Sequence, residues 1–582
     1  MKIRALIFAF FMIGQLLLVG DADRWIGKNL RRMSLKEKIA QMIFHPIAPN
    51  FVNRDSEYYA YLRFLVRDLK IGGLHVWSAP TYDTAFSLNR CQAWAEVPLL
   101  FTADMELGAG GVVRRELFRG TLTKEYRPEY ISGGGVRLPS LMALGATRSE
   151  ELSYRAGLIT AKEARSVGIH INFSPVMDVN NNPDNPIINY RSFGEEVELV
   201  KKLGTAYIRG SQAGGLIATA KHFPGHGDTS TDTHIELPVL PFDMKRLETV
   251  ELPPFVAAIE AGVKAIMTAH IALPAITGDR RPATLSHVIL TDLLRNRLRF
   301  NGLIITDGMV MGGITQTYDD RTAAVEAVKA GADILLFFAR PQDAIEGIAD
   351  AVLRHEIAES RIDESVRRIL GAKRALGLDR KKQIDLNKIE LDLDSKDHIR
   401  LAEEIADKAV TLLKNSPGLL PLSAGTDCTI IKISDQFLPE EGIHFANALR
   451  ETVSVRNEFY LWQESNRENF AAVLERIPPG SLVVCPAFFY IGAWKGKSAV
   501  PEGIVEFLRE LTEKECRLVL VSFGSPYVFR DIPFSDAYLC AYFGTRELER
   551  AAARVLIGAL HPSGRMPVTI PGYFHVGDGS GF

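Results

Sequence analysis

Short apolar runs alternate with helical patterns about eight times between residues 37 and 375, and this alternation restricts the possible folds more than any other feature. Several runs are apolar throughout, which is typical of strands buried on both faces of a parallel sheet. Sequential parallel strands with right-handed helical crossovers close most simply into a (β/α)8, TIM-like barrel. The predicted barrel strands cover residues 41–45, 73–77, 98–104, 171–179, 216–223, 265–271, 302–307 and 332–338.

A second, smaller unit is predicted after the barrel. Residues 378–398 are rich in Asp and Lys and poor in apolar clusters, which indicates a linker. We expect a helix over residues 399–414, followed by strands at residues 429–433, 482–489, 518–524 and 537–543 that again alternate with helical patterns. The sequence therefore predicts a catalytic barrel over residues 23–377 and an α/β sandwich domain over residues 399–582.

The N-terminus has the pattern of a secretory signal peptide. Two basic residues precede an apolar run over residues 5–19, and small residues at positions 20–22 offer a cleavage site. The run is short for a membrane-spanning helix and contains Gly14 and Gln15. We therefore expect residues 1–22 to be a cleaved signal peptide, the protein to be exported to the periplasm or medium, and no stable membrane span to remain.

Composition excludes several other classes of function. Hydrophobic residues make up 47% and charged residues 24% of the 582 residues, as in ordinary soluble proteins. The net charge is −2 and there is no long basic run, so we expect no nucleic-acid partner. The five cysteines form no CxxC pair, and Cys485 and Cys540 lie in apolar runs, where we expect buried packing residues. We predict no disulfide framework, no metal site and no cofactor.

Polar residues stand at the carboxyl ends of five consecutive predicted strands. They are Asp104, Asp178, the pair Lys221 and His222, His270, and Asp307. One such residue could simply cap a strand or the helix that follows it. Five on the same rim of a barrel are harder to attribute to capping, because the carboxyl ends of barrel strands are where the chemistry of this fold takes place. This rim is the predicted active site.

Residues 221–234 form the chemically richest segment. Pro224 and two glycines exclude a helix, so a strand is expected to run into a long loop. One interpretation is a metal site, since His222 and His226 have the spacing of a helical pair, but without a helix we do not expect that spacing to bring them together. The interpretation that we favour is a mobile loop carrying Asp232 and His234 on one face, where the carboxylate orients the imidazole.

Asp307 follows an apolar strand and precedes Gly308, which allows a sharp turn. An aspartate in such a place can merely cap the next helix. As one of several rim groups, however, Asp307 is placed as the carboxylate nucleophile of a retaining glycosidase would be.

These motifs together resemble glycoside hydrolase family 3, in its β-N-acetylglucosaminidase branch and two-domain form. The segment with the pattern KHFPGHGDTxxDTH, residues 221–234, is the most specific. The resemblance extends from about residue 35 to the C-terminus. Further matching segments are residues 172–178, 189–194, 267–270 and 282–286 in the barrel, and residues 412–415 and 564–568 in the second unit.

The resemblance implies roles for individual residues. Asp307 would be the nucleophile, and His234, oriented by Asp232, the acid/base. The residues implied to bind sugar hydroxyls are Asp104, Arg191, Lys221, His222 and Arg114, the last being the best match to an arginine of the family. The family usually reads Asp-x-Glu-Gly-Gly at the third strand, whereas this chain has Asp-Met-Glu-Leu-Gly at residues 104–108.

The implied activity is that of a retaining, exo-acting β-N-acetylglucosaminidase, with oligosaccharides of peptidoglycan or chitin as substrates. The ordinary imidazole pKa near 6.5 suits acid/base catalysis near neutral pH. Three alternatives stay open. They are a β-N-acetylglucosaminide phosphorylase, since an imidazole repels an anionic acceptor less than a carboxylate does, a β-glucosidase of the same family, and a carbohydrate-binding protein without catalysis.

Overall fold

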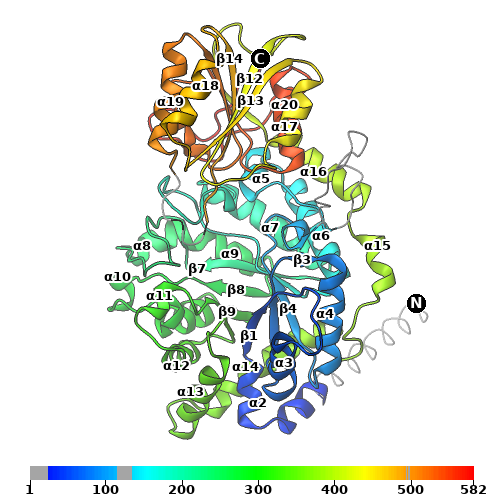
Figure 1. Cartoon of the computed structure of the whole chain (residues 1–582). Coiled ribbons are helices and arrows are strands. Elements are labelled where there is room, and N and C mark those ends of the chain that lie inside the picture. The colour runs from blue at the N-terminus through cyan, green and yellow to red at the C-terminus, as the bar shows by residue number, and fades with distance from the viewer. Residues whose placement is uncertain (1–23, 115–133, 493–494, 496–498) are drawn as a thin grey trace, which may run out of the picture.

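The computed structural model describes residues 24–114, 134–492, 495 and 499–582. It contains a closed barrel, coloured blue to green in Figure 1, and a second α/β unit, coloured yellow to red, above it. The predicted signal peptide, residues 1–22, lies outside the described residues. Within the described part of the chain, no helix has the length and apolar character that a membrane crossing requires.

Eight parallel strands close the barrel, and each corresponds to a predicted strand. Going round the barrel their order is β1-β10-β9-β8-β7-β6-β4-β2, so consecutive barrel strands are neighbours and β1 pairs with β10 to close it. The strands are β1 (Ile43–Ile47), β2 (Gly73–Val76), β4 (Leu100–Ala103), β6 (Ile171–Asn172), β7 (Ile217–Phe223), β8 (Ala265–Thr268), β9 (Leu303–Gly308) and β10 (Ile334–Leu336). The TIM-like fold is confirmed.

Helices connect these strands and cover the barrel. Every residue of β2, β4, β7 and β8 is buried, as expected for strands that pack against the barrel interior on one face and the helices on the other. The main helices are α3 (Glu57–Arg63), α4 (Thr81–Trp94), α6 (Glu150–Ser166), α7 (Val197–Ala213), α9 (Leu252–Glu260), η7 (Val288–Arg297), α12 (Asp320–Ala330), α13 (Pro341–Leu353) and α14 (Glu359–Ala375). Short strands β3 (Ala79–Pro80) and β5 (Val113–Arg114) pair outside the barrel.

The second unit is a six-stranded sheet flanked by helices. Its order is β11-β16-β15-β14-β12-β13, with β11 antiparallel to β16 and the other pairs parallel. The strands are β11 (Thr411–Asn415), β12 (Asp427–Ser434), β13 (Ser454–Trp462), β14 (Leu482–Phe488), β15 (Arg517–Ser522) and β16 (Ala537–Cys540). The helices are α17 (Ile443–Arg450), α18 (Arg467–Glu475), α19 (Glu502–Glu513) and α20 (Arg546–Leu556). The predicted second α/β domain is therefore present.

Two strands of this sheet were not predicted. The helix expected over residues 399–414 ends at Ala409, and the last residues of that range form β11. The helix stops because Val410 has an extended backbone and the β-branched Thr411 follows. Strand β13 is at the edge of the sheet and exposes Arg456 and Glu458, so its polar sequence carries no strong strand signal.

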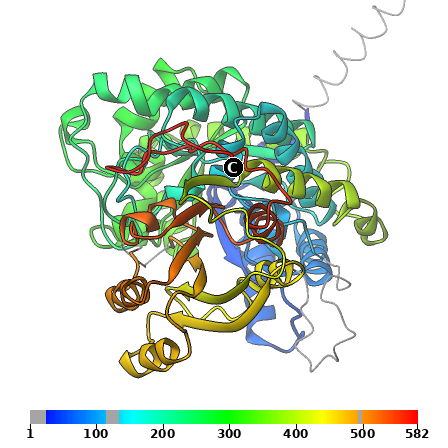
Figure 2. The same cartoon turned by 90° about the horizontal axis from the view of Figure 1, so that it is seen from above.

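The two units pack directly on one another. Helix α16 (Lys396–Ala409) buries Leu401 and Ile405 against a cluster that includes α6 and α7, while its Ala406 and Ala409 belong to the core of the second unit. Helix α5 (Leu141–Thr147) of the barrel contributes to both clusters. Seen from above, the second unit lies over one side of the barrel (Figure 2).

The segment between the units, predicted to be a linker over residues 378–398, contains η8 (Leu386–Lys388) and α15 (Ile389–Asp392). Its Ile389 is buried in the barrel core. The five cysteines are buried, in agreement with the packing role expected for Cys485 and Cys540.

Candidate active site

A cavity of about 540 Å³ opens at the carboxyl ends of the barrel strands. Six of the predicted site residues line it, namely Asp104, Arg191, Lys221, His222, His234 and Asp307. They come from three strand ends and two connecting segments that are far apart in the sequence. The structure therefore brings His234 and Asp307 to one cavity, as the sequence analysis expected.

Asp307 is held at the end of β9 by its own backbone turn. Its Oδ1 accepts a hydrogen bond of 2.7 Å from the backbone N–H of Gly308. Burial would raise the pKa of Asp307, but the imidazoles of His270 and His222, this N–H group and Lys221 hold the pKa below its usual range. The carboxylate is therefore ionised near neutral pH, which is the form that a nucleophile requires.

His234 is oriented by Asp232 on the loop after β7. Its Nδ1 lies 2.9 Å from Asp232 Oδ1, and its backbone N–H donates to the same oxygen at 2.8 Å. Because a carboxylate oxygen accepts, Nδ1 carries the proton of this bond. The side chain of Asp232 is only 1% exposed and that of His234 is 25% exposed, so the carboxylate supports the imidazole from behind.

The segment that follows Asp307 fixes the position of this loop. The backbone N–H groups of Gly312 and Gly313 donate to the carbonyls of His234 and Thr233, at 3.0 and 3.1 Å. A Cβ atom at residue 312 would come within 2.7 Å of the His234 carbonyl oxygen, so glycine is required for this approach. The strand that carries Asp307 thus continues directly into the support for the imidazole.

A buried ion network forms the floor of the cavity beside Asp104. Lys221 Nζ lies 2.8 Å from Asp104 Oδ1 and 2.7 Å from Glu106 Oε1. Arg191 makes a two-point pair with Glu106, at 2.8 and 2.7 Å. Lys221 and Arg191 keep the pKa of Glu106 well below its usual range although burial opposes this shift. Two cations and two carboxylates balance, which stabilises charges in a largely buried place.

His222 is oriented by a carboxylate as His234 is. Its Nδ1 lies 2.7 Å from Asp178 Oδ2, and the backbone N–H of His226 donates to Asp178 Oδ1 at 2.7 Å. Burial would raise the pKa of Asp178, but His222, His226 and the backbone N–H of His226 hold it below its usual value.

Glu106, Asp178, His226 and His270 are the residues that the predicted site lacked. Asp178 and His270 were recognised only as strand ends, and the signal for Glu106 was its place two residues after Asp104. The structure also corrects the expectation that His222 and His226 lie apart, because their ring centroids are 5.8 Å apart without any helix between them. Among the described residues there is no group of three or more His, Cys, Asp or Glu side chains arranged to hold a metal ion.

Arg114 is the last residue of β5, paired through its backbone with Pro80 of β3. Its contact with a sugar stays a prediction. The other predicted binding residues lie in the cavity, as described above.

Apolar groups make the remaining walls of the cavity. Trp77, Phe173 and Phe337 come from the barrel, and Trp77 is 48% exposed at the rim. Ile491 and Gly492 come from the second unit, after β14. The second unit therefore contributes directly to the cavity, a contribution that the sequence did not predict.

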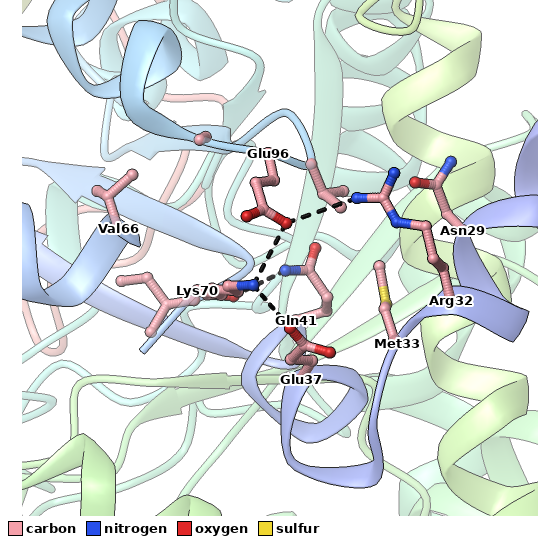
Figure 3. Close-up of a pocket in the computed structure, with 11 residues that line it drawn as sticks. Asn29, Arg32, Met33, Glu37, Gln41, Val66, Lys70 and Glu96 are labelled. Carbon is pink, nitrogen blue, oxygen red and sulfur yellow. Dashed lines mark hydrogen bonds and ion pairs between the residues drawn. The ribbon is translucent and has the colours of Figure 1, made fainter. Parts of the chain in front are cut away.

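The opposite end of the barrel holds a different kind of hollow. A cavity of about 40 Å³ lies next to Ile71 and Val97, just before β2 and β4 begin (Figure 3). Lys70 Nζ pairs there with Glu37 and Glu96, at 2.7 and 3.3 Å. Arg32 also pairs with Glu96, at 3.5 Å, so that two cations balance the two carboxylates. Because the amino-terminal face of such a barrel contributes to stability, the larger cavity is the candidate active site.

Comparison with known proteins agrees with this geometry. The glycosyl hydrolase family 3 N-terminal domain matches residues 125–372. A β-N-acetylglucosaminidase/β-glucosidase of Cellulomonas fimi is 34% identical over 416 residues, which are 69% of this chain and 68% of that protein. Beta-hexosaminidase A of Pseudoalteromonas piscicida is 28% identical over 560 residues, covering 87% of this chain and 90% of that protein.

Solved structures show the same two-unit architecture. A glycoside hydrolase family 3 β-N-acetylglucosaminidase from Paenibacillus sp. str. FPU-7 is 31% identical, with a TM-score of 0.79, over 92% of this chain and 99% of that chain. A β-glucoside phosphorylase, BglX, is 26% identical, with a TM-score of 0.80, over 95% of this chain and 96% of that chain.

Proposed function

The chain belongs to glycosyl hydrolase family 3, and from that premise we propose that it is a retaining exo-β-N-acetylglucosaminidase. It would release single β-linked N-acetylglucosamine residues from the ends of oligosaccharides. The observation that carries this proposal is that an imidazole oriented by a carboxylate through Nδ1 and an ionised carboxylate line one cavity.

In the first step Asp307 attacks the anomeric carbon and forms a glycosyl-enzyme ester. The bond to the leaving oxygen breaks at the same time, and His234 Nε2 gives its proton to that oxygen. In the second step His234 takes a proton from water, the water oxygen attacks the anomeric carbon, and the Asp307 carboxylate is released. Each displacement inverts the anomeric carbon, so the glycosyl-enzyme is α-linked and the second step restores the β configuration in the product.

The network of Asp104, Lys221 and Arg191 would hold the hydroxyl groups of the terminal sugar. Carboxylate and cationic groups at fixed positions provide acceptors and donors together, which suits a ring with several hydroxyl groups. Tied to Asp178 through Nδ1, His222 presents its other edge to the same space.

We also propose that the protein acts outside the cytoplasm, as the pattern of residues 1–22 suggests. The substrates there would be fragments of peptidoglycan or chitin. Product analysis on muropeptides and on chitobiose in parallel separates these two sources.

The test of the activity is release of the aryl group from an aryl β-N-acetylglucosaminide and from the matching aryl β-glucoside. We expect clear release from the first, and loss of release in Asp307→Asn with an unchanged circular dichroism spectrum. Good activity on the glucoside without activity on the N-acetylglucosaminide would refute the substrate. Retained turnover by Asp307→Asn would refute the nucleophile.

Phosphorolysis is the second candidate, favoured by the histidine in place of a carboxylate acid/base and by the likeness to a β-glucoside phosphorylase. The same reaction run with and without inorganic phosphate discriminates the two. A sugar 1-phosphate product would show that the reaction is phosphorolysis and not hydrolysis.

A further inference from the structure

Three aromatic side chains, one exposed and two half-buried, gather on the second unit, outside the catalytic cavity. We call Phe437, Tyr460 and Trp462 the aromatic cluster. Ring centroids are 5.0 Å apart for Phe437 and Trp462, 5.5 Å for Phe437 and Tyr460, and 5.7 Å for Tyr460 and Trp462. Phe437 is 60% exposed. Large aromatic groups gathered at a surface in this way mark a binding surface more often than single exposed residues do.

A cavity of about 310 Å³ adjoins the aromatic cluster, which is within the size range of small-molecule sites. Its apolar lining is Phe437 and Trp462. Its polar lining is Asp435, Gln436, Gln463 and Glu464. The cavity thus combines two aromatic side chains with four polar ones, a lining that suits an occupant with an apolar face and a polar edge.

The cavity lies at the carboxyl ends of β12 and β13, beside the point between β12 and β14 where the connections of the sheet change direction. The chain leaves β12 toward β13 on one side, and leaves β14 toward β15 on the other. Ligands of such sheets bind outside the carboxyl ends of strands at the point where connections change direction. Here Asp435 follows β12 and Lys495 follows β14, and Lys495 Nζ lies 2.7 Å from Asp435 Oδ2.

Hydrogen bonds hold one member of the aromatic cluster, Tyr460, in place before any ligand binds. The hydroxyl group of Tyr460 lies 2.7 Å from Ser434 Oγ, donates to the carbonyl of Gln436 at 2.6 Å and accepts from the N–H of Leu438 at 2.6 Å. Oδ1 of Asp435 is a buried acceptor without a hydrogen-bond partner among the described residues. A fixed aromatic platform loses little conformational entropy on binding.

The lining selects the chemistry of the occupant. Two carboxylates and two amides disfavour an anionic ligand, whereas they accept hydrogen bonds from hydroxyl groups. A pyranose ring offers apolar C–H faces to the aromatic rings and hydroxyl groups at its edge. We propose that the aromatic cluster and its cavity form a second carbohydrate-binding site, which holds a pyranose unit of a neutral, β-linked glycan chain.

One loop joins this site to the catalytic cavity. Lys495 Nζ, besides pairing with Asp435, donates to the carbonyl of Tyr490 at 3.2 Å. The next two residues, Ile491 and Gly492, line the catalytic cavity. A glycan held at the aromatic cluster is therefore kept close to the catalytic cavity, and its ends reach a high effective concentration there. This consequence rests on the proposed function, but binding itself requires no catalysis.

Binding to insoluble chitin tests the site. The measurement uses Asp307→Asn to prevent turnover, so that retention on chitin reports binding alone. We expect the protein to be retained on chitin, and we expect Trp462→Ala to weaken this binding about three- to tenfold, the range that aromatic contacts typically contribute. The double variant with Trp462→Ala and Phe437→Ala should bind more weakly still. Trp462→Phe, which keeps a ring, retains most of the binding. Phe51→Ala is the matched control, because Phe51 is 78% exposed and lines neither cavity.

Retention that is equal with and without the aromatic rings, or no retention of the parent protein, overturns the proposal. So does an equal loss in Phe51→Ala. Hydrolysis of an aryl β-N-acetylglucosaminide by Trp462→Ala with otherwise native sequence should be unchanged. Failure of that hydrolysis in the native protein refutes the proposed function while leaving the chitin result standing, so the two failures are distinguishable.

Discussion

At the scale of single residues, the site relies on carboxylates that act through imidazoles. Asp232 supports His234 and Asp178 supports His222, each through an Nδ1 contact shorter than 3.0 Å. In each pair the carboxylate is the more buried partner, with an exposed side-chain fraction of 1% for Asp232 and 0% for Asp178. Such a partner fixes the tautomer and favours the imidazolium form that a proton donor must pass through.

This arrangement predicts that the effect of Asp232→Asn on kcat depends strongly on the leaving group of the substrate. The amide oxygen can still accept from the backbone N–H and from Nδ1, but it lacks the charge that stabilises an imidazolium. We expect kcat on substrates with sugar or alkyl leaving groups to fall by about 10²- to 10⁴-fold. Nitrophenyl glycosides, which need little protonation, should lose much less in glycosyl-enzyme formation. Steady-state and burst kinetics across a series of leaving groups measure this.

Asp228→Asn is the control for this prediction. Asp228 lies on the same loop but pairs with Arg246 at 3.3 Å. Substitution of Asp228 should change kcat by the same factor for all leaving groups, or should leave it unchanged. An equal loss for good and poor leaving groups in Asp232→Asn would contradict the role of Asp232 in proton transfer.

At the scale of elements, the sequence predicted best where one physical signal dominates. The barrel strands are short and apolar because they are buried on both faces, so all eight were found. Strand β13 was missed because an edge strand alternates charged and apolar residues, and β11 because it follows α16 without a break rich in Gly or Pro. A local sequence pattern alone does not reveal that a segment will pair with a distant strand.

The site was predictable to the same degree. Residues that end apolar strands or belong to the long motif, such as Asp307 and His234, were predicted as site residues, and both line the cavity. Glu106 was missed because its importance comes from contacts with Lys221 and Arg191. These residues are 115 and 85 positions away in the chain, and they meet Glu106 only when the barrel closes. The contribution of Ile491 depends on docking of the second unit and leaves no mark in the local sequence.

Helix α17 begins at a buried carboxyl group supplied by another helix. Glu549 of α20 accepts from the backbone N–H groups of Gly442 and Phe445, at 3.1 and 3.0 Å. Burial raises the pKa of Glu549 from 4.5 to about 7, with a further contribution from Glu441, although these N–H groups oppose the shift. The folded protein therefore favours the neutral carboxyl group.

We predict that this part of the stability is lost as the pH rises. Because the folded pKa lies above the unfolded one, the stabilisation is complete below about pH 4.5 and disappears as pH rises through about 7. The free energy of unfolding should fall by roughly 1–3 kcal/mol from this group between pH 5 and pH 8. Urea unfolding at both pH values, compared between native protein and Glu549→Gln, measures the difference in slope. A pH dependence that Glu549→Gln does not reduce would contradict the prediction.

At the scale of the whole molecule, the second unit is held against the barrel by apolar packing and by hydrogen bonds near the site. Asn180 donates to the Tyr527 hydroxyl group at 3.1 Å, and Asn189 donates to Ser525 Oγ at 3.0 Å. Farther along, Glu195 accepts from the backbone N–H and the hydroxyl group of Thr569, at 2.7 and 2.6 Å. The barrel segment that carries Arg191 is thus bonded to the second unit on both sides of this arginine.

The bond closest to the cavity is made by Tyr190, which is next to Arg191. Removing this hydrogen bond should change substrate binding while leaving catalysis largely unchanged. The Tyr190 hydroxyl group donates to the carbonyl of Ile491 at 3.1 Å, and Ile491 lines the cavity. Tyr190→Phe keeps the ring packed but removes the bond, so the wall formed by Ile491 is held less firmly. We expect KM to rise about three- to tenfold, the effect of about 1 kcal/mol, while kcat changes little. Tyr538→Phe is the control, because that hydroxyl group donates to the Pro526 carbonyl inside the second unit at 2.6 Å. Tyr538→Phe should lower Tm without raising KM. An unchanged KM in Tyr190→Phe would contradict the prediction, because the second unit would then form a wall of the cavity without affecting how tightly the cavity binds sugar.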